Sequence, residues 1–156
     1  MADTRGVLIL LVDDDVTGRS VRKLVLEANG HIVLATGEAR PALRALTQEP
    51  VSPVILDYFL DGIMGTELAR QMRLAKPNVP ILLLSASADK PEGTEHVDAF
   101  LSKLEPTGVI EDKIAELLRR QSAGLKTQNA ETRKDHEKQR PVPRVNRTQV
   151  PHKAAG

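Results

Sequence analysis

The sequence predicts an α/β protein with a doubly wound parallel sheet and helices on both faces, in three layers. Two observations predict this fold class. Five short apolar runs alternate with stretches of helical spacing, and the polar residues that could do chemistry follow the apolar runs directly. Alternating strands and helices favour right-handed crossovers, and therefore a parallel sheet that is covered on both faces.

The five apolar runs are the expected strands. Each run is short and rich in Val, Ile and Leu, which is typical of parallel strands that are buried on both faces. The expected strands are 7–12, 31–35, 51–56, 80–85 and 98–103.

The stretches between the runs show helical spacing and helix stop signals. Helices are expected within 17–30, over 37–48, over 65–77 and within 105–121. An apolar stripe on the first comprises Val21, Leu24, Val25 and Ala28. One face of the last comprises Val109, Ile110, Ile114, Leu117 and Leu118. We expect both apolar faces to pack on the sheet.

Polar residues follow four of the five expected strands. They are Asp13, Asp14 and Asp15 after the first, Asp57 at the end of the third, Ser85 at the end of the fourth and Lys103 at the end of the fifth. Ligands bind beyond the carboxyl ends of parallel strands, so we expect these side chains to meet at one edge of the sheet. Adjacent carboxylates repel and raise one another's pKa, so the acidic cluster indicates a bound cation.

These residue types support phosphoryl chemistry. Carboxylates of Asp13, Asp14 and Asp57, with one backbone carbonyl, would form part of an oxygen shell for Mg²⁺. Asp57 would be the nucleophile that accepts a phosphoryl group. Lys103 would neutralise phosphoryl oxygens, and Ser85 would donate a hydrogen bond to one of them.

Four segments, LLVDDD, VILDYFLDGIMG, LLLSASA and DAFLSK, stand in an order and spacing that resemble the receiver domain of bacterial two-component response regulators. The resemblance covers roughly residues 6–121, and we assign 1–121 to this domain. It implies a flavodoxin-like fold with strand order 2-1-3-4-5. The implied site residues are Asp57 as phosphoacceptor, Asp13 and Asp14 as magnesium carboxylates, Phe59 as the carbonyl ligand of the metal, Lys103 as the phosphate-binding lysine, and Ser85 with Phe100 as the switch pair.

The chain departs from the family pattern in three places. Asp61 stands where the family usually has proline, and Lys103 is followed by Leu-Glu-Pro instead of directly by proline. The span from Ser85 to Phe100 is shorter than usual and contains Pro91 and Gly93, so a shortened or absent fourth helix is expected. This departure affects the surface that the family usually uses for output and for dimer formation. A homodimer is an alternative that the sequence does not decide.

The resemblance implies a stand-alone response regulator that is not an enzyme. A histidine kinase or histidine phosphotransfer protein would phosphorylate Asp57 in a magnesium-dependent phosphorelay, and a conformational switch would follow. The downstream protein partner is not indicated. One alternative is a receiver-like adaptor that is not phosphorylated.

A second alternative is an enzyme. The segment DDDVT matches the Asp-x-Asp-x-Thr signature of haloacid-dehalogenase-like phosphatases, with Asp13 as nucleophile and Asp15 as acid. Such a phosphatase needs a further acidic magnesium motif after the lysine, and it leaves Asp57 without a role.

Charge is distributed unevenly along the chain. Residues 1–120 carry 14 Lys and Arg against 18 Asp and Glu, whereas residues 121–156 carry 8 against 3. The polar, proline-containing segment 122–156 is expected to be a disordered basic tail. The chain has no cysteine, and no apolar stretch approaches the length of a membrane span. We expect a soluble cytoplasmic protein with neither a membrane nor a nucleic-acid partner.

Overall fold

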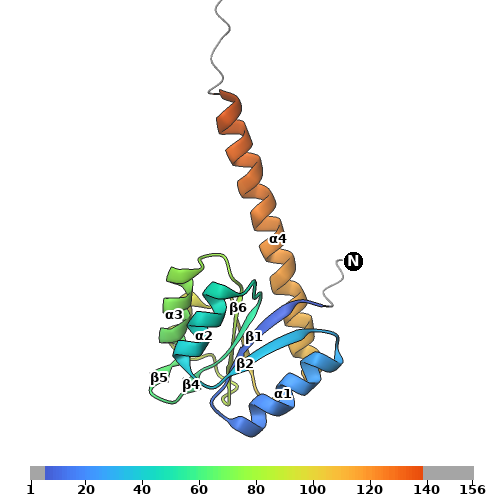
Figure 1. Cartoon of the computed structure of the whole chain (residues 1–156), viewed down its shortest axis with the longest axis vertical. Helices are drawn as coiled ribbons and strands as arrows, with labels where there is room; N and C mark the ends of the chain where they lie inside the picture. The colour runs from blue at the N-terminus through green and yellow to red at the C-terminus, as the bar shows by residue number, and fades with distance from the viewer. Residues whose placement is uncertain (1–5, 139–156) are drawn as a thin grey trace, which may run out of the picture. The chain divides into compact units, whose positions relative to one another are not determined.

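Five parallel strands form the sheet that the apolar runs predicted. In the computed structural model, which describes residues 6–138, these strands are β1 (Leu8–Val12), β2 (Ile32–Thr36), β3 (Val54–Asp57), β6 (Ile81–Ser85) and β7 (Ala99–Ser102). Their order across the sheet is β2-β1-β3-β6-β7, which confirms the order 2-1-3-4-5 (Figure 1).

The helices and strands form two apolar cores, one on each face of the sheet. The helices are α1 (Val16–Ala28), α2 (Ala39–Gln48), α3 (Gly65–Ala75) and α4 (Thr107–Lys138). Successive residues of a strand point to opposite faces, so Leu10 of β1 packs with α2 and α3, while Leu11 packs with α1 and α4. The three-layer α/β fold is confirmed.

Helix α1 does not bury the apolar stripe that was predicted for it. Val21 and Leu24 are 55% and 67% exposed, and Leu26 is the buried residue of the helix. Residues four apart share a helix face, and Arg22, four before Leu26, pairs with Asp13. The ion pair and the Leu26 contact together set the orientation of α1, and apolar spacing alone did not reveal it.

A two-stranded antiparallel pair, β4 (Phe59–Leu60) and β5 (Ile63–Met64), follows β3 directly. Residues 61–62 form its turn, and Gly62 has a φ of +78°, which glycine adopts without steric cost. No pattern in the sequence predicts this pair, because strands of two residues are too short to show a periodicity.

The connection between β6 and β7 holds a single turn of 3₁₀ helix, η1 (Thr94–His96). Gly93, just before it, has a φ of +72°, and no residue of η1 is buried. The shortened fourth helix is therefore confirmed.

Helix α4 packs on the sheet through the face that the sequence predicted, since Ile110, Ile114 and Leu117 are buried. The chain divides into two units, with the boundary between Gly124 and Leu125. Within residues 6–138, no helix combines the length and the apolar character that crossing a membrane requires.

The basic segment was expected to be disordered from residue 122, but α4 continues through Lys138. This expectation was wrong for residues 122–138, and residues 139–156 lie outside the described part of the chain. The segment 122–138 contains no proline and is rich in Ala, Lys, Glu, Gln and Arg, which have high helix propensity. A polar composition does not by itself indicate disorder, because several polar residue types have high helix propensity.

Candidate functional site

Asp13 and Asp57 lie side by side at the carboxyl edge of the sheet. Strand β1 pairs with β3 so that Val12 is opposite Leu56, and each aspartate follows its residue directly. The side chains of Asp13 and Asp57 are 2% and 9% exposed. Together with Asp14 they offer carboxylate oxygens that all lie within 4.8 Å of one another. The structure thus brings the three predicted metal carboxylates together.

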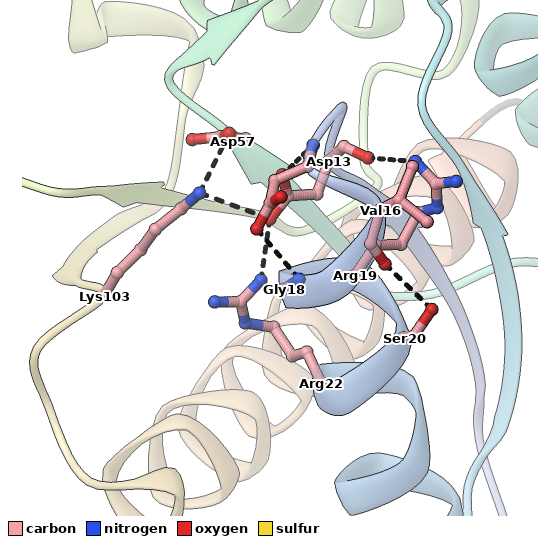
Figure 2. Close-up of polar contacts among 9 residues, drawn as sticks. Asp13, Val16, Gly18, Arg19, Ser20, Arg22, Asp57 and Lys103 are labelled. Atoms are coloured by element: carbon pink, nitrogen blue, oxygen red, sulfur yellow. Dashed lines mark hydrogen bonds and ion pairs between the residues drawn. The ribbon is translucent and has the colours of Figure 1, made fainter.

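Lys103 bridges the two buried aspartates. Its backbone N–H donates to the Ser85 carbonyl at 2.7 Å, which anchors the residue after β7 to the end of β6. Its ammonium Nζ lies 2.9 Å from Asp57 Oδ2 and 3.2 Å from Asp13 Oδ2 (Figure 2). The predicted phosphate-binding lysine therefore contacts the predicted phosphoacceptor.

The carboxylate of Asp13 is engaged through both oxygens. Oδ1 accepts the Asp15 backbone N–H at 3.0 Å, and Oδ2 accepts both Lys103 and the guanidinium Nη1 of Arg22, the latter at 2.8 Å. Arg19 donates to the Asp13 backbone carbonyl at 2.6 Å, so α1 contributes two arginines to this residue (Figure 2).

The two buried aspartates have opposite pKa shifts. Burial alone would raise the pKa of Asp13, but the Asp15 amide, Lys103 and Arg22 outweigh it and lower that pKa. Burial raises the pKa of Asp57, and the negative charge of Asp13 adds to this effect, while Lys103 opposes it only in part. Asp57 is therefore the carboxylate whose charge is less well compensated by protein groups.

The donor set fits magnesium. Three carboxylates within reach of one another are hard oxygen ligands of the kind that Mg²⁺ prefers. Asp14 is exposed and lines an open hollow of about 550 Å³ with Arg19, Gly37 and Asp61, so this carboxylate of the cluster is accessible from solvent.

The remaining predicted residues lie around this cluster. Ser85 is buried at the end of β6, and its hydroxyl oxygen accepts the Ser87 backbone N–H at 3.2 Å. Phe100 is half-buried on β7, in register with Leu83. Phe59, two residues after Asp57, begins β4 with its side chain 61% exposed.

Asp15 has a structural role. Its carboxylate accepts the Gly18 backbone N–H at 2.8 Å and caps the N-terminus of α1. This capping bond engages the residue that the phosphatase alternative requires as its acid.

Sequence reasoning missed Arg22, Arg19 and Gly65. A Cβ on Gly65 would lie 2.0 Å from the Asp57 carbonyl oxygen, so only glycine lets α3 begin this close to Asp57. The helical spacing of Arg19 and Arg22, three residues apart beside an acidic cluster, was a usable signal for the two arginines.

Comparison with protein families identifies one match, described as the response regulator receiver domain, which covers residues 9–129. The sensory/regulatory protein RpfC of Xanthomonas campestris pv. campestris is 30% identical over 125 residues, 74% of this chain and 17% of RpfC. The response regulator MprA of Mycolicibacterium vanbaalenii is 33% identical over 93 residues, 60% of this chain and 40% of MprA. The chain thus spans less than half the length of either relative.

Solved structures show the same fold. A response regulator receiver domain protein from Methanospirillum hungatei JF-1 superposes with a TM-score of 0.70 at 24% identity, covering 76% of this chain and 98% of that one. The response regulator TrrA of Thermotoga maritima, in complex with Mg²⁺ and BeF, gives 0.67 at 26% identity, covering 71% and 98%. TrrA in complex with the histidine kinase ThkA gives 0.67 at 27% identity, covering 72% and 98%.

Proposed function

Since this chain belongs to the response regulator receiver domain family, we propose that Asp57 accepts a phosphoryl group from a histidine kinase or a histidine phosphotransfer protein. The domain then acts as a magnesium-dependent signalling switch and not as an enzyme with a turnover of its own.

The contact of Lys103 with Asp57 carries this proposal. A lysine ammonium 2.9 Å from Asp57 Oδ2 is placed to pair with the oxygens of a phosphoryl group attached at that carboxylate. The raised pKa of Asp57 indicates a carboxylate with incomplete charge compensation, which favours it over Asp13 as the nucleophile. Asp13 already accepts an amide N–H and two cations.

The transfer is a displacement at phosphorus. A carboxylate oxygen of Asp57 attacks the phosphorus of a phosphohistidine, the P–N bond breaks, and its electron pair stays on the imidazole nitrogen of the donor. The product is an acyl phosphate on Asp57. The ammonium of Lys103 stabilises the negative charge that develops on the phosphoryl oxygens. The hydrogen bond from the Lys103 backbone N–H to the Ser85 carbonyl holds the main chain of this lysine in place.

Asp13, Asp14 and Asp57, with the backbone carbonyl of Phe59, are the proposed magnesium ligands. A bound Mg²⁺ supplies positive charge to the phosphoryl oxygens and lowers the repulsion between them and the carboxylates. The complex of the relative TrrA with Mg²⁺ and BeF supports this assignment.

The signal would leave the pocket through Ser85 and Phe100. The Ser85 hydroxyl is proposed to turn from the Ser87 amide toward the phosphoryl group, and Phe100 on the neighbouring strand β7 is proposed to follow it inward. The connection after β6 and the face of β7 are the surfaces that a downstream protein would read. The complex of TrrA with the kinase ThkA supports a kinase as the upstream partner.

The proposal is tested by incubating the protein with Mg²⁺ and acetyl phosphate and measuring the intact mass. We expect one phosphoryl adduct that is stable in acid, labile in base and absent when the metal is chelated. Asp57→Asn should abolish the adduct.

Asp61→Asn is the matched control, because Asp61 is an exposed aspartate four residues further on, at the turn between β4 and β5. It should leave the adduct intact. An adduct that persists in Asp57→Asn, or that maps to Asp13, would overturn the proposal in favour of the phosphatase alternative.

A further inference from the structure

Arg22 is a half-buried cation that the phosphoryl chemistry leaves without a role. Its side chain is 15% exposed, and Nη1 lies 2.8 Å from Oδ2 of Asp13, whose side chain is 2% exposed (Figure 2). The same oxygen receives the ammonium of Lys103 at 3.2 Å. The proposed function assigns Lys103 to the phosphoryl group. Arg22, which extends from α1, pairs with Asp13 and has no part in that function.

The orientation of α1 places Arg22 in this position. Arg22 and Leu26 share the inward face of the helix, while Val21 and Leu24 are turned to solvent. The fold therefore holds Arg22 against Asp13 while these two aliphatic side chains stay exposed.

Charge around Asp13 is close to balanced by protein groups alone. Three cationic side chains contact this residue, Lys103 and Arg22 at its carboxylate and Arg19 at its backbone carbonyl. Of the three, Lys103 and Arg22 contact the Asp13 carboxylate itself, and Lys103 also contacts Asp57. A divalent cation that binds at the Asp13 carboxylate meets two positive charges already in contact with it, and it is repelled unless one of them moves away or an anionic phosphoryl group arrives.

We propose that Arg22 competes with Mg²⁺ for the carboxylate of Asp13 and thereby sets the Mg²⁺ affinity of the unphosphorylated pocket. This inference rests on the proposed function, because that function assigns Mg²⁺ to the cluster. The guanidinium of Arg22 already holds Asp13 Oδ2, so a metal ion held by this carboxylate would have to share it with Arg22 or displace the guanidinium. Arg22 is thus a regulatory residue of the metal site and is not a ligand.

The test is a calorimetric titration of the full chain with MgCl₂, without a phosphodonor and at constant ionic strength, since salt screens the charges involved. For Arg22→Gln we expect the dissociation constant to fall by about fivefold or more, because removing one charge a few ångströms from the metal is worth on the order of a factor of ten. Arg22→Lys keeps the charge and should stay close to the wild type.

Lys23→Gln is the matched control. Lys23 is the next residue of α1, carries the same charge and pairs at 3.8 Å with Glu27, not with the acidic cluster. Its dissociation constant should stay within about twofold of the wild type. Equal or weaker Mg²⁺ binding by Arg22→Gln, or an equal gain in Lys23→Gln, would overturn the proposal.

A second measurement uses the wild-type protein and does not depend on a variant that folds. Arg22 guanidinium protons, followed by NMR during the MgCl₂ titration, should exchange faster with water as the metal binds. Unchanged exchange at saturating Mg²⁺ would also overturn the proposal. Neither readout involves phosphorylation, so failure of this inference is separate from failure of Asp57 to accept phosphate.

Discussion

Two connections leave the same edge of the sheet from neighbouring strands, and they are built differently. The connection after β3 contains β4, β5 and α3, and α3 buries Leu68, Ala69 and Met72. The connection after β6 contains only η1, which buries no residue. Strong packing thus follows the strand that carries Asp57, and weak packing follows the strand that carries Ser85.

Under the proposed function, the difference separates the phosphoryl chemistry from the signal output. Asp57 contacts Lys103, and α3 begins in direct contact with the Asp57 backbone at Gly65. The segment 86–97 has few buried contacts, so its local opening costs little free energy, as expected of an element that changes between two states. We therefore expect phosphorylation to order or shift this segment and not to slide a preformed helix.

The largest expected effect tests the packing of the two connections directly. Leu68→Ala removes a fully buried side chain from the core between α3 and the sheet, and should lower the free energy of unfolding by about 3 kcal/mol. Val97→Ala, at the partly buried end of the other connection, should cost about 1 kcal/mol or less. Urea unfolding followed by circular dichroism measures both.

Leu74→Ala is the control for α3, since Leu74 is 73% exposed and its loss should change stability by less than about 0.5 kcal/mol. Equal losses for Leu68→Ala and Val97→Ala would remove the contrast between the connections.

The next effect concerns local opening. Amide hydrogen exchange in segment 86–97 should be at least about tenfold faster than in α3 of the free protein. Adding Mg²⁺ and beryllofluoride should slow exchange in 86–97 and leave α3 unchanged. Mass spectrometry of peptic fragments measures both regions in one experiment. A segment 86–97 that is already protected in the free protein contradicts the expected ordering.

The smallest expected effect tests how well protein groups compensate the charge of Asp57, the residue after which the well-packed connection begins. Because the pKa of Asp57 is raised in the folded protein, its contribution favours folding at low pH and is lost as pH rises through that pKa. Asp57→Asn should therefore raise the melting temperature by a few degrees at pH 7, with little gain at pH 3.

The pKa shift of Asp13 has the opposite sign to that of Asp57, and Asp13→Asn serves as the comparison. Its pKa is lowered, so its contribution is present above the ordinary aspartate pKa and is lost as pH falls. Asp13→Asn should lower the melting temperature at pH 7, and the loss should shrink toward acid. A decrease with Asp57→Asn at pH 7 would contradict the assigned pKa directions.

The sequence by itself determined the fold class and the composition of the site. Apolar runs alternating with helical segments predict a parallel sheet, and the carboxyl ends of parallel strands meet at one edge. Asp57 ends a strand and Asp13 and Lys103 each follow one directly, so their meeting is a consequence of local pattern and topology alone. The short connection between Ser85 and Phe100 likewise predicted the reduced fourth helix.

Only the tertiary structure decided which face of α1 is buried and how the charges of the site are paired. Apolar spacing favoured Val21 and Leu24, yet Arg22 and Leu26 point inward. A helix face is chosen by what lies opposite to it. Here that includes the buried carboxylate of Asp13, which is costly to bury without a cation and which Arg22 pairs with. The spacing of Arg19 and Arg22 after the acidic cluster hints at this pairing, but the burial of the Asp13 carboxylate that makes the pairing necessary arises only in the folded sheet.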